Sequence, residues 1–112
     1  MLSEESHRLD AELSMWREGR SCVDYAVYVS DLPPCSPKRW NEMAAQMRAL
    51  GICQDTSFGV TTVRGEWGFF QIPAANFPEM KVTFFQTARV AERIRLLTAI
   101  RKIVITNRSS DG

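Results

Sequence analysis

Two aromatic side chains near the middle of the chain could bind a flat ligand by stacking. Trp67 and Phe69 lie two residues apart in the stretch 63–73, V-R-G-E-W-G-F-F-Q-I-P. Alternate residues of a β-strand point to the same face, so this spacing predicts both rings on one face, with Phe70 and Ile72 on the other. Nucleobases are flat groups that stack on exposed aromatic rings. The stretch therefore predicts a strand with one core face and one binding face.

No set of side chains has the spacing of an active site or a metal site. The single histidine, His7, is far from the three cysteines, and Cys22, Cys35 and Cys53 are too widely separated for a zinc ligand set. An odd number of cysteines also disfavours a disulfide framework, so we expect reduced thiols. No nucleophile has a neighbouring base in the sequence. We expect a protein that is not an enzyme and that needs no cofactor or metal.

Length and charge restrict the class of protein. The 112 residues suit one domain, and the formal net charge is +1. Residues 1–31 hold seven acidic side chains against three arginines, whereas residues 88–108 hold six basic side chains against Glu92 alone, which predicts a basic patch. The chain has no apolar run long enough to span a membrane and no signal-peptide pattern. We expect a cytoplasmic or intraviral protein with no membrane partner.

Periodicity and capping signals predict the elements that hold these residues. Ser36 followed by Pro37 marks a helix start, and Gly51 marks its end. Residues 80–85 are apolar and β-prone, and residues 101–106 fit either a closing strand or the last turns of a helix. In chain order the other predicted elements are a helix over 3–18, a strand over 22–30, a helix over 36–50, strands over 58–63 and 63–73 that form a hairpin, and a helix over 88–99.

These elements predict a single α+β domain over residues 1–112. It has an N-terminal helix within 1–20, an α+β core over 21–106 and a flexible polar tail over 107–112. The order strand, helix, strand, strand, helix, strand is the split βαβ, ferredoxin-like arrangement, an antiparallel sheet with both helices on one face. We expect the sheet to be centred on Val27 and Phe70.

Two segments resemble the motifs of the RNA recognition motif family. Residues 27–32, V-Y-V-S-D-L, are similar to the family's first-strand motif, and residues 65–72, G-E-W-G-F-F-Q-I, are similar to its third-strand motif. The resemblance covers residues 24–106. The sequence departs from the family where Arg64 lies one position early, where Glu66 replaces a glycine and where residues 74–87 form an insertion.

The resemblance implies non-catalytic binding of single-stranded RNA on the sheet. Bases would stack on the aromatic residues that match the family's stacking positions, which are Tyr28, Trp67 and Phe69. Basic side chains would neutralise phosphate, and the expected ones are Arg64, Arg101 and Lys102.

The alternative interpretation is a winged-helix domain that binds duplex DNA. Here the helix over 36–50 would enter the major groove, and the hairpin tip at Arg64 would form the wing. The side chains expected to contact bases or phosphate are Lys38, Arg39, Asn41 and Gln46. This fold requires another helix directly before residue 36, whereas the alternation over 22–30 predicts a strand.

A protein interface is the third possibility. The aromatic residues named above can be covered by Leu9, Leu13 and Trp16 of the predicted helix over 3–18, or by a second copy of the chain. The protein would then be an interaction module or a small regulatory inhibitor, with a homodimer as one form. An aromatic face in contact with solvent indicates stacking, whereas a buried one indicates packing.

Overall fold

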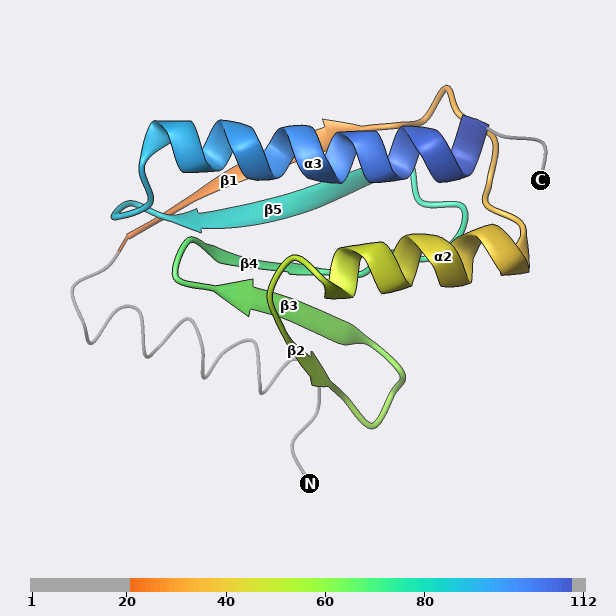
Figure 1. Cartoon of the computed structure of the whole chain (residues 1–112), viewed down its shortest axis with the longest axis horizontal. Coiled ribbons are helices and arrows are strands. Elements are labelled where there is room, and N and C mark those ends of the chain that lie inside the picture. The colour runs from red at the N-terminus through yellow and green to blue at the C-terminus, as the bar shows by residue number, and fades with distance from the viewer. Residues whose placement is uncertain (1–20, 110–112) are drawn as a thin grey trace.

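Local signals in the sequence produce seven regular elements in the computed structural model, which describes residues 21–109. In chain order they are β1 (Cys22–Tyr28), α2 (Pro37–Arg48), β2 (Ile52–Asp55), β3 (Thr61–Gly65), β4 (Gly68–Gln71), β5 (Glu79–Phe85) and α3 (Val90–Ser109). The strands form one sheet in the order β1-β5-β4-β3-β2, and every neighbouring pair is antiparallel. Both helices cover the same face of this sheet (Figure 1). The predicted α+β class is confirmed.

The order of elements differs from the split βαβ arrangement that we expected. Four consecutive strands follow α2 before the chain reaches α3, and β2 was not predicted at all. Consecutive strands joined by short connections pair with one another, so β2 to β5 form a meander and leave β1 only the free side of β5. Val27 therefore lies on an edge strand and not at the centre of the sheet, whereas Phe70 lies on the inner strand β4.

The core lies between the sheet and the two helices. Residues of β3, β4 and β5 that alternate along each strand point toward the helices, which contribute apolar residues at helical spacing. The fully buried apolar side chains from these elements are Val63, Phe70, Val82, Phe84, Met43, Met47, Ile100 and Val104. The predicted start of α2 is confirmed, because the Ser36 hydroxyl accepts a hydrogen bond from the backbone N–H of Arg39 at 3.3 Å.

The C-terminal residues are helical and anchored. Residues 101–106 belong to α3, and α3 continues to Ser109, so the prediction of a flexible tail from residue 107 is wrong for residues 107–109. Arg108 is 3% exposed, and its guanidinium donates hydrogen bonds to the carbonyls of Leu32, Pro33 and Phe77 at 2.8, 2.8 and 2.5 Å. These bonds tie the end of α3 to two loops, which is the physical reason why the chain stays ordered there.

Two further predictions concern the N-terminal helix and membrane-spanning segments. The helix predicted over 3–18 lies outside the described residues. Within residues 21–109, no helix is long and apolar enough to cross a membrane.

Candidate nucleic-acid interface

Trp67 lies in the core and not on a binding face. It occupies the two-residue turn between Gly65 and Gly68, which face each other across the β3–β4 hairpin. The Trp67 side chain is 7% exposed, and its ring stacks on that of Phe70 with 5.9 Å between centroids. The alternation argument fails because β4 begins only at Gly68, so Trp67 belongs to a turn and its direction is not set by the strand. The prediction that Trp67 and Phe69 share a face is wrong.

Phe69 and Tyr28 both lie on the outer sheet face, which we define as the face turned away from α2 and α3. Phe69 lies opposite Thr83 of β5, which lies opposite Asp24 of β1, whereas Tyr28 lies opposite Glu79. The two aromatic residues are therefore two strands apart and four residues apart along the strands. With strands ~4.8 Å apart and ~3.3 Å per residue, this separation is roughly 16 Å. The rings do not form one continuous stacking platform.

The outer sheet face carries charges of both signs. Tyr28 is 74% exposed, but it is paired across the strands with Glu79. Asp24 accepts a hydrogen bond from the Thr83 hydroxyl at 2.7 Å on the same face. Arg64 is exposed directly opposite the half-buried Phe69. This face therefore has aromatic and basic side chains near acidic ones, an arrangement that weakens attraction for phosphate.

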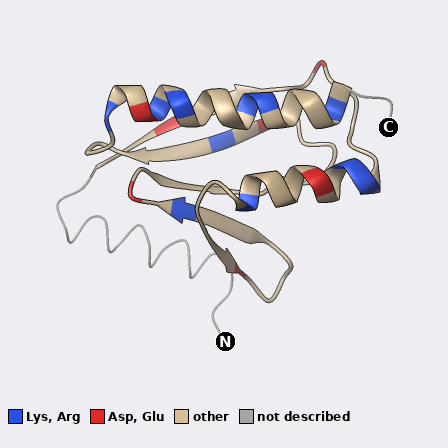
Figure 2. Cartoon of the chain, in the orientation of Figure 1, with Lys and Arg blue, Asp and Glu red and all other residues tan. Residues whose placement is uncertain are grey.

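The positive charge is concentrated on the helices. The strands hold Arg64 and Lys81 against Asp24, Asp55 and Glu79. The helices hold Lys38, Arg39, Arg48, Arg93, Arg95, Arg101, Lys102 and Arg108 against Glu42 and Glu92 (Figure 2). Arg101 and Lys102 are exposed on α3 and so lie on the other side of the sheet from Tyr28 and Phe69. The structure therefore separates the predicted phosphate-binding residues of α3 from the predicted stacking residues.

The residues predicted for duplex DNA lie in the same layer as Arg101 and Lys102. Lys38 and Asn41 are exposed on α2, which lies beside α3 (Figure 1). Arg39 is half-buried and donates to Glu42 at 3.1 Å, and Gln46 accepts a hydrogen bond from the Asn107 amide at 2.8 Å. The segment directly before α2 contains β1 and a loop, so it has a strand where a winged-helix domain requires a helix.

Several basic residues of the helices are already engaged within the protein. Arg93 donates to the carbonyls of Phe85, Gln86 and Ala88, and Arg108 is buried. We define the helix-layer cations as the exposed basic residues of α2 and α3 that are not held in this way, which are Lys38, Arg95, Arg101 and Lys102. Of these, only Arg95 forms an ion pair among the described residues, with Glu92 at 3.9 Å, and its side chain is still 77% exposed.

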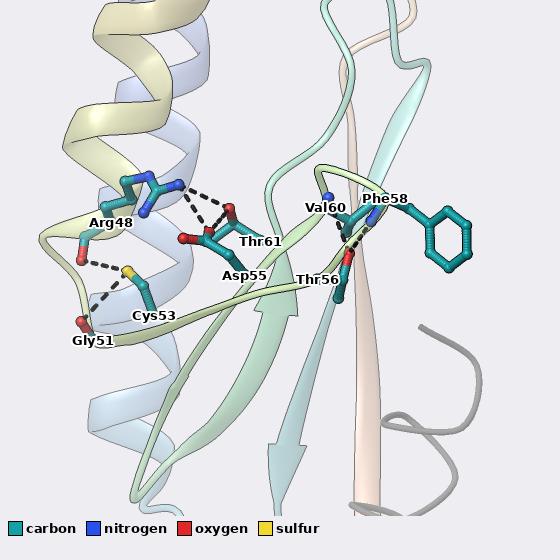
Figure 3. Close-up of polar contacts among 8 residues, drawn as sticks. All are labelled: Arg48, Gly51, Cys53, Asp55, Thr56, Phe58, Val60 and Thr61. Atoms are coloured by element: carbon teal, nitrogen blue, oxygen red, sulfur yellow. Dashed lines mark hydrogen bonds and ion pairs between the residues drawn. The ribbon is translucent and has the colours of Figure 1, made fainter. Parts of the chain in front are cut away.

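A polar cluster that the sequence did not reveal joins the end of α2 to the β2–β3 hairpin (Figure 3). Asp55 accepts hydrogen bonds from Thr61 and from Arg48, at 2.5 and 3.0 Å. These hydrogen bonds hold the pKa of Asp55 below its ordinary value. The next turn is closed by the Thr56 hydroxyl, which accepts from the backbone N–H groups of Phe58 and Val60. The hydrogen bonds of this cluster connect α2 to the β2–β3 hairpin, so we assign the cluster to structure and not to binding.

Cys35 is a thiol in the core of the described chain. Cys35 is buried, and burial raises the pKa of its thiol while the charge of Arg108 acts in the opposite direction. A raised pKa makes the thiol a poor nucleophile at neutral pH. Within residues 21–109, no group of three or more histidine, cysteine or acidic residues could hold a metal ion.

Comparison with known proteins gives no family for this chain. No protein-family model, no curated protein and no solved structure matches it.

Proposed function

We propose that this protein is a non-catalytic nucleic-acid-binding protein that contacts phosphate groups through its helix layer. The observation that carries the proposal is the separation of charge between the layers: basic residues are in excess on α2 and α3, whereas the strands hold slightly more acidic than basic residues (Figure 2). The helix-layer cations are exposed and three of the four have no ion pair among the described residues. Such side chains release condensed counterions when they bind a phosphate backbone, which favours binding.

The expected binding has little dependence on base sequence. Lysine and arginine contacts to phosphate position a nucleic acid but do not read bases, and base readout requires polar side chains near the backbone contacts. On α2 the exposed Asn41 can supply such a contact, whereas Gln46 is already bonded to Asn107. Affinity should therefore depend mainly on salt and on the number of phosphates.

Charge reversal on each layer tests the proposal. We would measure binding of fluorescently labelled single-stranded RNA and duplex DNA by polarisation at two salt concentrations. The test variant is Arg101→Glu with Lys102→Glu, and the matched control is Arg64→Glu with Lys81→Glu, which changes net charge equally on the outer sheet face. We expect the helix variant to lose about tenfold or more in affinity, and the sheet variant to lose much less.

The other outcomes are informative. An equal loss in both variants would mean that only net charge matters, and a loss in the sheet variant alone would return the site to Arg64 and Phe69. Absence of salt-sensitive binding to either nucleic acid would overturn the proposal.

A protein partner with an acidic surface is the second candidate. Three apolar side chains of α3 are exposed among the cations, namely Val90 at 67%, Ile94 at 59% and Ile105 at 41%. Exposed apolar patches rimmed by polar residues mark protein-interaction sites, so these side chains are the candidate contacts. Ile94→Ser distinguishes the two candidates, because it removes apolar area and should weaken a protein complex while leaving phosphate binding unchanged.

A further inference from the structure

The strand β1 forms one edge of the sheet that residues 21–109 build. It spans Cys22–Tyr28, and among the described strands it pairs with β5 alone. An edge strand presents backbone N–H and C=O groups that its own sheet does not use, and these groups can pair with another strand. The residues of β1 that present these groups are those whose backbone does not bond to β5.

The hydrogen bonds at the two ends of β1 show which of its residues bond to β5. The Ser21 carbonyl accepts from the N–H of Gln86, and the N–H of Val29 donates to the Pro78 carbonyl, so odd-numbered residues direct their backbone groups toward β5. In an antiparallel pair this direction alternates from one residue to the next. The N–H and C=O groups of Asp24 and Ala26 therefore point away from the sheet along its free edge.

This edge has few of the features that usually prevent pairing, and Asp24 is the one charged side chain among its residues. Proline, lysine, a β-bulge or very short length protects natural edge strands. The opposite edge, β2, has four residues, and it ends at Asp55, whose carboxylate is bonded to Arg48. In contrast, β1 has seven residues, C-V-D-Y-A-V-Y, with no proline and no lysine.

The side chains of β1 that face the helices are incompletely covered. Tyr25 packs edge-on against Phe84, with 5.5 Å between ring centroids, yet it is 39% exposed. Val23 and Val27, on the same face, are half-buried. Residues at these positions in an inner strand, such as Val82, which lies opposite Tyr25, are fully buried. A strand added beside β1 would cover this apolar row.

We propose that β1 pairs antiparallel with β1 of a second copy of the chain, around a two-fold axis at Tyr25. A two-fold axis places the same strand on both sides of the interface, and the alternation of β1 is then self-complementary. Asp24 lies opposite the partner's Ala26, so these residues form hydrogen-bonded pairs on both sides of the axis. Tyr25 lies opposite the partner's Tyr25, and Val23 opposite the partner's Val27, on the helix-facing side.

The charge pattern agrees with this register. Asp24 is the only charged residue of β1, and the two-fold axis places it opposite an alanine and not opposite the partner's Asp24. Like charges directly opposite each other would destabilise the pair, whereas aromatic and β-branched pairs stabilise it. The product is a dimer with one continuous sheet and with helices on one face of each half.

The experiment measures the mass of the full-length protein by light scattering over a range of concentrations, together with backbone amide exchange. We expect a mass of twice 12.7 kDa at high concentration, and at least tenfold slower exchange of the Asp24 and Ala26 amides in the dimer than in the dilute monomer. The variant Ala26→Pro removes an N–H that β5 does not use, so it should give a folded monomer. Ala26→Thr keeps this N–H and is the matched control, which should remain a dimer.

Each result decides for or against the pairing. A monomer at all concentrations overturns it, as does a dimer in which the Asp24 and Ala26 amides exchange freely. A dimer that persists in a folded Ala26→Pro variant also overturns it. If Ala26→Pro does not fold, amide exchange in the unaltered protein still distinguishes the two outcomes. The pairing does not depend on nucleic-acid binding, which the charge-reversal variants test separately.

Discussion

At the scale of single residues, Arg108 joins the end of α3 to two loops. Its guanidinium is buried, donates to three backbone carbonyls from two loops, and lies over the Phe77 ring at 4.8 Å. Arginine suits this place because its planar group holds several donors in fixed directions. Without it, carbonyl groups of both loops lose their partner.

We therefore expect Arg108→Met to lower the free energy of unfolding by about 2–4 kcal/mol. Urea unfolding followed by circular dichroism measures this change. Arg101→Met is the control, because Arg101 is exposed on the same helix, and surface substitutions usually change stability by less than about 0.5 kcal/mol. Equal effects of the two substitutions would contradict the anchoring role.

Asp55 gives a prediction about pH. Its hydrogen bond from Thr61, followed by that from Arg48, lowers its pKa in the folded protein from 3.8. A lowered folded pKa means that this carboxylate contributes stability above pH 3.8 and that the contribution disappears as pH falls through the lower, folded value. We expect Asp55→Asn to be less stable than the unaltered protein at pH 6, and the difference to shrink at pH 3. A difference that is the same at both pH values, measured by urea midpoints, would contradict this linkage.

At the scale of elements, the β3–β4 hairpin depends on the close approach of β4 to β5. Gly68 has a φ of +145°, and a Cβ atom there would lie 1.9 Å from the Thr83 carbonyl oxygen. Gly59, between β2 and β3, has a φ of +80°, but a Cβ atom there would meet nothing within 4 Å. A side chain at Gly68 would therefore meet both backbone strain and a steric clash, whereas a side chain at Gly59 would meet backbone strain alone.

We expect Gly68→Ala to destabilise the protein by about 3 kcal/mol, because the strands must move apart and the backbone is strained. Gly59→Ala should cost only about 1 kcal/mol, from backbone strain alone. Thermal unfolding of both variants checks the order. Similar melting temperatures would show that β4 and β5 separate more easily than the geometry indicates.

At the scale of the whole molecule, the layered architecture distributes the charge. Because α2 and α3 lie on one face, basic residues from segments far apart in the sequence share one layer (Figure 2). A surface formed in this way should bind phosphate with a measurable salt dependence.

We expect the slope of log affinity against log salt for duplex DNA to become shallower by about 2 when Arg101 and Lys102 are both changed to glutamine. Titrations at four or more salt concentrations measure this slope. Replacing Arg64 and Lys81 by glutamine should leave the slope nearly unchanged. The reverse pattern would assign phosphate contacts to the outer sheet face.

Local signals determined the elements that depend on nearby residues. The alternation of β1, the proline and serine at the start of α2, and the apolar strand β5 were all predicted from the sequence. Each of these signals acts over a few residues, through side-chain direction or capping, and so can be interpreted without the rest of the chain. The strand β2 has only four residues and carries no such signal.

The tertiary structure alone decided how these elements meet. Strand order, the edge position of β1 and the separation of Tyr28 from Phe69 depend on pairing between distant segments, which periodicity does not encode. The core position of Trp67 depends on a two-residue turn, and the helical state of residues 101–109 depends on the burial of Arg108 against loops more than 30 residues away. Residue types suited to stacking or to phosphate binding could thus be named from the sequence. Only the fold decided which of them share a surface, because that depends on contacts between segments far apart in the chain.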